Sequence, residues 1–390
     1  GMWSCRCDSD RARVRPRRGP RRHSCAGFFM SGGGLAMYLT ELRVRNLRIF
    51  GELELTLDPG WNLFLGPNGA GKSSVLEAAY LLSHGQSFRR GARDTLTRFD
   101  SPGFSVFGRL QTAGGNTRSV AIGRNEARTE ARVDGEAVSL GELVRNCAVV
   151  CFEPGSHELI SGKADERRHY LDWGVFHVEP TFLSHWRWFQ RALRQRNSAL
   201  RAAGPVEALA PWEQEMADSG TLLSAMRRAY VEKLQPVLGD MLHTLLGELG
   251  HGQLDFDQGW KAEQGLADVL LANRGRDQDR GHSTRGPHRA DWSIRFAKAP
   301  RREHLSRGQE KLCALALVLA QARLHSELLG EWPILCLDDL ASELDQAHQE
   351  AVLGLALASG AQVLLTGTSA PFWPVPDMRV FHVEQGRISA

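Results

Sequence analysis

The sequence has few cysteines, no long hydrophobic run and no internal repeat, and these absences narrow the class of protein. Seven cysteines among 390 residues, none of them in a CxxC pair, exclude a disulfide framework and a zinc ribbon. The longest apolar run, Leu312 to Ala320, is far shorter than the roughly 20 residues of a membrane-spanning helix. With 42% hydrophobic residues the chain can still bury a core. We therefore expect a soluble cytoplasmic protein with no membrane partner.

A uniformly basic surface is also missing, although the formal net charge is +3. Residues 1–36 contain eight arginines and two aspartates, a charge of +6, which leaves −3 for the other 354 residues. This segment has the composition of a basic nucleic-acid-binding arm or a targeting peptide, but translation that starts at Met37, where a clean strand pattern begins, is the favoured explanation. We expect a disordered basic extension upstream of the true start and assign no function to it.

Beyond Met37 the hydrophobic pattern predicts an α/β core that is interrupted by a helical insertion. Strands are expected within 37–57 and 104–138, and at 61–65, 148–152, 333–337 and 362–366. Helices are expected at 72–83, 309–328 and 346–358. A further helical region is expected over 164–250, broken by Pro180, Pro205, Pro211 and Pro236. Residues 273–289 are polar and rich in Gly and Arg, which predicts a mobile loop. The expected units are the extension 1–36, the N-terminal part of a head at 37–160, a helical arm at 161–272 and the C-terminal part of the head at 273–390.

A glycine-rich turn between the strand at 61–65 and the next helix matches the P-loop pattern GxxxxGK[ST]. It consists of Gly66, Pro67, Asn68, Gly69, Ala70, Gly71, Lys72 and Ser73. The glycines allow backbone N–H groups to surround phosphate oxygens at a helix N-terminus, and Lys72 brings a positive charge to the β- and γ-phosphates. The Ser73 hydroxyl is placed to bind Mg²⁺. The pattern predicts a site for ATP and Mg²⁺.

Two adjacent acids, Asp338 and Asp339, follow an apolar strand and supply the carboxylates that a P-loop needs. We expect Asp338 to hold Mg²⁺, directly or through water, and Asp339 to polarise the water that attacks ATP. The alternative for Asp339 is a helix N-cap or a group that supports the metal ligand. Two neighbouring buried carboxylates repel each other without a cation, which also favours a bound metal.

The sequence Leu305-Ser306-Arg307-Gly308-Gln309 opens a helix about thirty residues before these acids, and Ser342-Glu343-Leu344-Asp345 follows them. In this order the motifs resemble an ABC-type ATPase head. The resemblance implies that Ser306 and Gly308 of one subunit contact the γ-phosphate held by the P-loop of another, and that Asp345 lies in the loop that crosses the dimer interface. It therefore implies an ATP-dependent homodimer with catalytic roles for Lys72 and Asp339.

Further segments resemble the RecF family of SMC-like ATPases over residues 37–390. They are Asn46-Leu47-Arg48, Arg167 to Gly174 (RRHYLDWG), Gln195-Arg196-Asn197 and Gly286-Pro287-His288-Arg289-Ala290-Asp291. The implied fold is an ABC/SMC-type head with a mixed sheet, flanking helices and an inserted helical arm. The chain departs from the family at Pro154-Gly155 and Gly162-Lys163, and Thr366-Gly367-Thr368 stands where many ABC heads have a histidine. The residues themselves assign no role to His288 and Arg289.

The same resemblance implies a function in DNA replication and DNA repair, within the SOS response to DNA damage. It implies sequence-independent binding to single- and double-stranded or gapped DNA, and joint action with RecR and RecO in loading RecA. ATP hydrolysis would be slow, stimulated by DNA, and would act as a switch. The alternatives are the nucleotide-binding subunit of a transporter, or an ABC-type machine with a non-DNA partner. The long helical insertion and the missing histidine weigh against the transporter.

Two clusters of arginines are candidates for DNA contacts. Arg89 and Arg90 follow the P-loop helix, where the resemblance to SMC heads places an arginine that touches phosphate of ATP or DNA. Arg187, Arg191 and Arg194 share one face of a predicted helix. In both cases an ordinary solvated face is the alternative. A second stripe on that helix, Phe182, Trp186, Phe189 and Leu193, is expected to be core.

Overall fold

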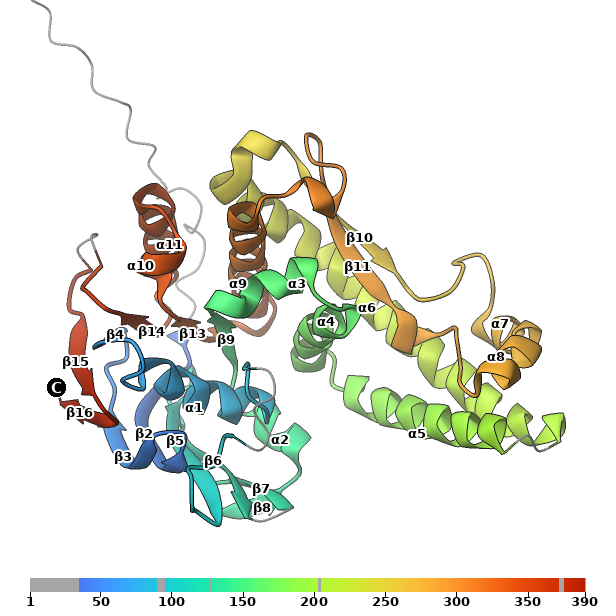
Figure 1. Ribbon diagram of the computed structural model, residues 1–390, viewed down its shortest axis with the longest axis horizontal. Coiled ribbons are helices and arrows are strands. Elements are labelled where there is room, and N and C mark those ends of the chain that lie inside the picture. Colours follow the sequence, from blue (N-terminus) through green and yellow to red (C-terminus); the bar gives the residue numbers. More distant parts are fainter. Residues whose placement is uncertain (1–34, 90–94, 126–127, 203–204, 372–374, 390) are drawn as a thin grey trace, which may run out of the picture.

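The computed structural model describes residues 35–389, apart from 90–94, 126–127, 203–204 and 372–374. The expected extension over residues 1–36 therefore lies outside the described residues, except for Leu35–Ala36, which form strand β1. The molecule consists of a head with two large sheets and an arm of long helices that projects from it (Figure 1).

The first sheet of the head carries the P-loop. Its strands follow the order β16 (Arg387–Ser389), β15 (Arg379–Glu384), β4 (Trp61–Leu65), β14 (Val363–Gly367), β13 (Ile334–Leu337) and β9 (Val149–Phe152). All neighbours are parallel except β15 and β16. The strands β13 and β14 are buried on both faces, as continuous apolar runs in a parallel sheet require. The carboxyl ends of β4, β14 and β13 thus lie side by side.

The second sheet is antiparallel and covers one side of the head. It runs β3 (Phe50–Thr56), β2 (Tyr38–Leu47), β5 (Gly103–Gln111), β6 (Thr117–Asn125), β7 (Arg128–Val133) and β8 (Glu136–Val138). Alternate residues of β2 and β5 are buried, which is the pattern of a sheet with one solvated face. Helix α2 (Leu140–Arg145) follows β8.

Two hydrophobic cores lie on the two sides of the parallel sheet. Phe64, Cys336 and Leu364 point into the core that the antiparallel sheet and α1 (Lys72–His84) complete. Their chain neighbours, such as Leu63 and Leu365, point into the second core, which continues into the arm. Because successive side chains of a strand point to opposite faces, each strand packs into both cores, and the sheet lies between the two layers.

The remaining elements of the head belong to its C-terminal part. They are η6 (Arg302–His304), α9 (Arg307–Leu329), β12 (Glu331–Trp332), which pairs with β1, α10 (Leu340–Glu343) and α11 (Gln346–Ser359). Among the described helices, α9 alone is long and apolar enough to cross a membrane, and 72% of its apolar window is buried inside the protein. It is the central helix where the two units meet.

The arm is built from a helical hairpin and a small antiparallel ribbon. Its elements are α3 (Glu158–Ser161), α4 (Ala164–Val178), α5 (Phe182–Arg201), η3 (Val206–Leu209), α6 (Ala210–Leu246), η4 (Gly247–Leu249), β10 (Gly252–Asp257), α7 (Leu266–Ala272), α8 (Arg274–Arg280), η5 (Pro287–Arg289) and β11 (Asp291–Phe296). The segment η2 (Pro154–His157) leads into it. Helix α6 runs without interruption for 37 residues through Pro236, so the expected break there is wrong. Pro211 lies in the first turn of α6, where a proline is tolerated.

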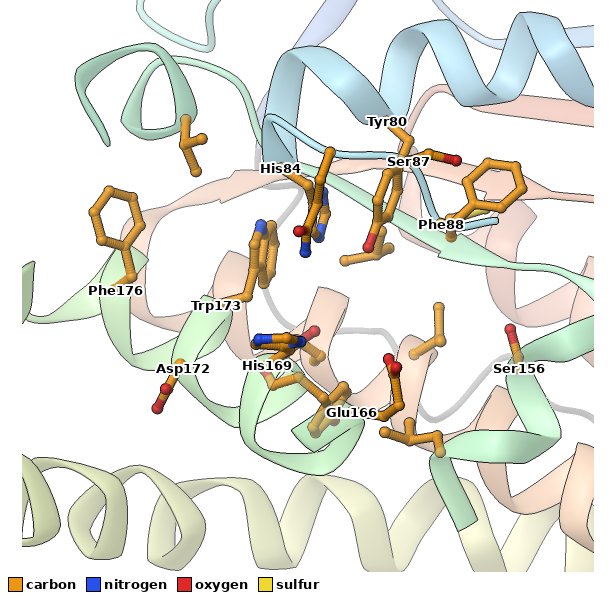
Figure 2. A pocket seen from close by; sticks show the side chains of 18 of the residues that line it. Tyr80, His84, Ser87, Phe88, Ser156, Glu166, His169, Asp172, Trp173 and Phe176 are labelled. Carbon is orange, nitrogen blue, oxygen red and sulfur yellow. The ribbon is translucent and has the colours of Figure 1, made fainter. Parts of the chain in front are cut away.

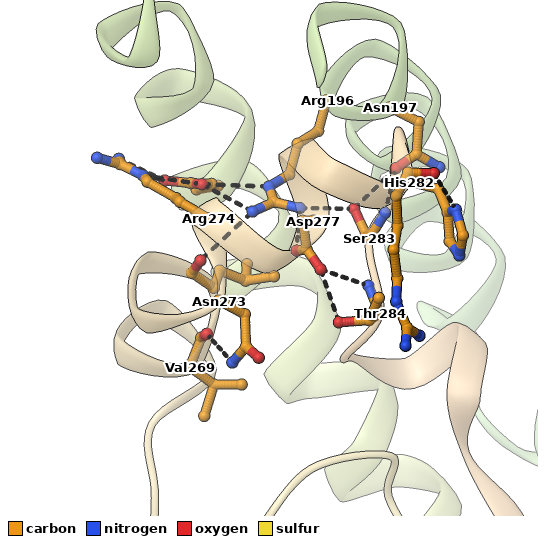
Figure 3. A network of polar contacts seen from close by, with 12 residues as sticks. Arg196, Asn197, Val269, Asn273, Arg274, Asp277, His282, Ser283 and Thr284 are labelled. Atoms are coloured by element: carbon orange, nitrogen blue, oxygen red, sulfur yellow. Dashed lines mark hydrogen bonds and ion pairs between the residues drawn. The ribbon is translucent and has the colours of Figure 1, made fainter. Parts of the chain in front are cut away.

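The segment 273–289 is ordered, in contrast to the mobile loop expected from its composition. Figure 3 shows the reason: the guanidinium of Arg196, fully buried on α5, donates to Asp277 at 2.7 Å and to Glu213 at 3.0 Å. Asp277 also accepts from Thr284, at 2.6 Å from the hydroxyl. A buried charge requires partners, and here α8 and the following loop supply them. Since β11 also pairs with β10, the chain returns to the head only after Phe296, beyond the boundary expected at residue 273.

Helix α4 joins the arm to the head, and the RRHYLDWG segment is the contact face. Arg167 holds Asp291 through two bonds of 2.6 and 3.0 Å, and the Tyr170 hydroxyl donates to Leu317 O of α9 at 2.8 Å. The ring of Trp173 stacks on His84 at the end of α1 (Figure 2). A cavity of about 640 Å³ opens beside these rings.

Candidate nucleotide site

The P-loop forms the turn from β4 into α1 as the pattern predicts. Gly71 has a φ of 111°, a backbone conformation that L side chains rarely adopt. At Gly66 an added Cβ would lie 2.1 Å from Val383 O of β15. Both positions therefore need glycine for the chain to turn tightly into the helix. The N-terminus of α1 then faces the same side of the sheet as the carboxyl ends of the strands.

Lys72 and Ser73 lie at the start of α1. The Lys72 ammonium is buried, and it donates to Gly66 O at 2.7 Å and to Pro67 O at 2.9 Å. These bonds hold the positive charge over the loop whose N–H groups form the phosphate cradle. The Ser73 side chain lines the same cavity as Asp338 and helps to lower the pKa of the Asp338 carboxyl, so that the two proposed metal ligands are adjacent.

Asp338 directly follows β13 and is 4% exposed. Burial raises the pKa of its carboxyl, while hydrogen bonds from Thr366 and Ser73 oppose that effect. The Thr366 hydroxyl, at the end of β14, donates to Asp338 Oδ1 at 2.6 Å and accepts from Asp339 N at 2.8 Å. Thr366 thus orients both acids. The donor set of one hydroxyl and one buried carboxylate, with a second carboxylate beside it, fits the oxygen ligands that Mg²⁺ prefers.

Asp339 is the N-cap of α10 and has a φ of 51°. Aspartate tolerates this left-handed conformation better than most residues. Its carboxylate accepts a hydrogen bond from the Ser342 hydroxyl and lines the same cavity as Asp338. The two acids therefore line one cavity, and Asp339 also occupies the N-cap position that was its alternative, without a hydrogen bond from its side chain to the helix backbone.

A cavity of about 210 Å³ lies between the P-loop and the two acids. Its lining includes Arg48 and Arg89 in addition to Asn68, Lys72 and Ser73. Both arginines are directed by Glu77, a fully buried residue one helical turn beyond Ser73. Glu77 pairs with Arg48 through bonds of 2.7 and 2.9 Å and lies 4.0 Å from Arg89. Three cationic side chains and two carboxylates therefore line one cavity, which suits a triphosphate with a divalent metal.

Arg48, Glu77 and Thr366 were not singled out as site residues from the sequence. The sequence offered one signal for each residue. Arg48 lies in a segment that resembles the family, Glu77 is an acid on the buried face of a helix, and Thr366 stands at the end of a strand. Arg89 lies in the wall of the nucleotide cavity, and Arg90 lies outside the described residues.

Ser306 and Gly308, the residues expected to contact the γ-phosphate from another subunit, lie at the start of α9. Ser306 is the exposed N-cap of α9, and a capping box joins it to Gln309 with bonds of 3.2 and 3.0 Å. Gly308 is exposed in the first turn. Neither residue lines the cavity around Lys72. The structure thus presents a helix N-terminus at the surface, away from its own P-loop.

Asp345 is the N-cap of α11, and its carboxylate accepts from His348 N at 3.0 Å. That bond and the contact with the His348 ring lower the pKa of the Asp345 carboxyl. Its side chain is 65% exposed. On the arm, Arg187, Arg191 and Arg194 are exposed on α5. The aromatic stripe of this helix is only partly core, because Trp186 is exposed while Phe182, Phe189 and Leu193 are buried.

Comparison with known proteins identifies the family. A family model described as the RecF/RecN/SMC N terminal domain matches residues 38–387. A protein of Stenotrophomonas maltophilia (strain R551-3), named DNA replication and repair protein RecF, is 44% identical over 362 residues, which cover 91% of this chain and 100% of the relative. The chain belongs to the RecF family. A RecF protein of Thioalkalivibrio sulfidiphilus (strain HL-EbGR7) is 37% identical over 357 residues, covering 90% of this chain and 99% of the relative.

Solved structures confirm the RecF fold. The structure of the recombination mediator protein RecF-ATP in the RecFOR pathway superposes with a TM-score of 0.82 at 27% identity, covering 91% of this chain and 98% of that chain. The corresponding RecF-ATPrS structure gives a TM-score of 0.79 at 28% identity, covering 90% and 98%. The expected ABC/SMC-type head with an inserted helical arm is confirmed, and the chain is a member of a family of DNA replication and repair proteins.

Proposed function

We propose that this chain is an ATP-gated DNA-binding protein of recombinational repair and replication restart. The observation that carries the proposal is the division of the site: Lys72, Ser73 and Asp338 gather around one cavity, while Ser306 caps the exposed N-terminus of α9, outside that cavity. A helix N-terminus attracts anions, and the Ser306 hydroxyl, which accepts from Gln309 N, can still donate its own hydrogen. A second copy therefore completes the site by placing Ser306 and Gly308 over the γ-phosphate. ATP then closes a homodimer, in which Asp345 lies near the crossing loop.

Hydrolysis reopens this dimer. Ser73 and Asp338 hold Mg²⁺, which neutralises charge on the phosphate oxygens. Lys72 and Arg48 hold the phosphates in place, and Asp339 polarises the attacking water from its fixed position beside Asp338. Asp339 is held beside the cavity by Ser342 and by its backbone bond to Thr366. We propose slow turnover, stimulated by DNA, that acts as a switch.

The DNA-binding role follows the family and the charge distribution. Residues 37–390 are slightly acidic, so binding requires a local basic surface that dimerisation doubles. Arg187, Arg191 and Arg194 supply such a surface, whereas Arg89 faces the nucleotide. RecR, RecO and RecA are the proposed partners, in line with the RecFOR pathway named for the solved structure.

The test is fluorescence anisotropy of a gapped duplex titrated with the full chain, in ATP-Mg²⁺ and in ADP, with Lys72→Ala as the control. Binding that is tight only with ATP and lost in the variant supports the clamp. Binding that is equal in ATP and ADP would reject ATP gating. ATP-dependent dimerisation without DNA binding would favour the alternative of an ABC-type machine with a non-DNA partner.

A further inference from the structure

The exposed face of α5 has a composition found on few helix surfaces. This 20-residue helix contains no Asp or Glu. Arg187, Arg191, Arg194 and Arg201 occupy positions i, i+4, i+7 and i+14, so they share one face over about 21 Å at 1.5 Å per residue. None of the four has an ion pair with a described residue, whereas Arg196, on the opposite face, is fully neutralised by Asp277 and Glu213. The helix thus carries four uncompensated charges.

Trp188 lies at the edge of this face, about 100° around the helix from Arg187 and on the side of Arg191. Its side chain follows Arg187 and lies one helical turn before Arg191, and the residue is 51% exposed. The imidazole of His185 packs edge-on against the indole, with centroids 5.2 Å apart and planes inclined by 79°. The indole of Trp188 is therefore accessible to a ligand that also contacts the neighbouring arginines.

We propose that the Arg187–Arg201 face of α5 binds single-stranded nucleic acid, with phosphates on the arginines and an unstacked base on Trp188. This inference rests on the proposed DNA-binding function and specifies the part of the DNA that the arm contacts. Arginine tracks with interspersed aromatic rings bind single strands, because every unpaired base offers a face for stacking. In a duplex the bases are stacked on one another and are inaccessible to an exposed indole. The face therefore distinguishes the unpaired part of a gap from its duplex flanks.

The opposite side of the helix argues against a membrane as the ligand. Phe189, Ala192 and Leu193 are buried against the rest of the arm, so α5 has no apolar face left to enter a lipid interface. Trp188 alone is too small an apolar area for that purpose, whereas a single stacking ring is sufficient for a base.

The experiment compares full-length proteins by anisotropy in ATP-Mg²⁺, using labelled oligothymidylate and a blunt duplex of the same length. The segment 1–36 is present in all of them and does not differ between variants. Trp188→Ala should weaken oligothymidylate binding about tenfold and change duplex binding less than about twofold, and Trp188→Phe should restore most of the loss. Arg191→Gln with Arg194→Gln should reduce the salt slope of single-strand binding by about 1.4, or 0.7 per lost phosphate contact.

The matched control is Lys233→Gln with Lys261→Gln, which removes two exposed charges from other elements of the arm and should leave the slope unchanged. Oligothymidylate affinity that is unaffected by Trp188→Ala would overturn the inference, provided that the wild type binds DNA only with ATP. Absence of ATP-dependent binding in the wild type would instead overturn the proposed function. Retention on phosphatidylserine vesicles that is lost in the same variants, with DNA binding unchanged, would assign the face to a membrane and also overturn it.

Discussion

The indole ring of Trp173 stacks on the imidazole ring of His84, with centroids 5.3 Å apart and planes inclined by 6°. His84 is the last residue of α1, the helix that begins at Lys72, and Trp173 belongs to α4, the first long helix of the arm. On the same helix Tyr170 holds α9, which begins beside Ser306. One face of α4 therefore contacts the far end of α1 and the middle of α9, the two helices whose N-termini are proposed to face phosphate.

Trp173→Ala should destabilise this junction. Removal of a buried aromatic side chain costs about 3–5 kcal/mol of unfolding free energy. The space left by the indole adds to the cavity that already lies beside Trp173, so the neighbouring side chains lose their contacts. The matched control is Trp188→Ala, which removes an exposed indole from α5 and should change stability by less than about 0.5 kcal/mol. Urea unfolding of the two variants measures the difference, and equal midpoints would contradict the structural role given to Trp173.

The same junction makes stability depend on pH. Burial lowers the pKa of His84 to about 3, and it also lowers the pKa values of His177 and His325, which lie around Trp173. In the unfolded chain each imidazole binds a proton near pH 6.5, and in the folded protein it does not. The unfolded state thus binds more protons below pH 6.5, so this stability is present above pH 6.5 and is lost as pH falls toward the folded pKa values.

His84→Phe keeps a ring between Tyr80 and Trp173 but removes the titrating group. Between pH 6 and pH 5 the variant should lose about 1.4 kcal/mol less stability per pH unit than the wild type, which corresponds to one proton. Urea midpoints across this range, where most carboxylates remain ionised, give the two slopes. Identical slopes would mean that His84 is protonated in the folded protein.

The sequence was sufficient for the elements and for the P-loop, because both depend on local patterns. The expected helix at 72–83 and strand at 61–65 match α1 and β4 to within one residue. The periodicity was not sufficient at Pro236, because packing of α6 against α5 and α9 outweighs the local cost of a proline. At 273–289 it failed because the order comes from Arg196, a residue about eighty positions earlier.

The candidate site was foreseen as a set of motifs but not as a network. Thr366 reaches Asp338 because β14 and β13 are neighbours in the sheet, and that adjacency is invisible in a single sequence. Arg48 and Glu77 meet across 29 positions by the packing of a strand turn on α1. Such residues could be found only once the topology was known, since each is ordinary in its local context.

Glu77→Gln should lower the affinity for ATP about tenfold. The substitution keeps the size of the side chain but removes the charge that holds Arg48 in the wall of the cavity, and charge-assisted pairs of this kind are the stronger hydrogen bonds. A fluorescent ATP analogue measures the dissociation constant. Glu52→Gln is the control, because it removes the exposed pair with Arg45 and should leave the affinity unchanged. Equal affinities for both variants would show that Arg48 does not contact nucleotide.

Thr366→Val should slow ATP hydrolysis about tenfold, as expected when the group that orients a metal ligand is removed. Loss of the donor should also raise the pKa of the Asp338 carboxyl further, which moves the acidic limb of the pH–rate profile upward. Thr366→Ser retains the hydroxyl and should restore both properties. A valine variant with wild-type rate and pH profile would remove Thr366 from the site.

Ser306→Arg tests whether α9 acts across a dimer. The side chain of Ser306 is exposed and lies outside the cavity around Lys72, so the substitution should leave ATP binding by the isolated subunit unchanged. At the proposed interface the larger cationic residue removes the capping hydroxyl and obstructs close approach to the γ-phosphate of the second copy. Sedimentation velocity with a non-hydrolysable ATP analogue should therefore show a dimer for the wild type and a monomer for the variant.

Ser293→Arg, the same change on an exposed strand of the arm, should still dimerise. If Ser306→Arg instead lost nucleotide binding as a monomer, the site would be complete within one chain and the shared-site model would be rejected.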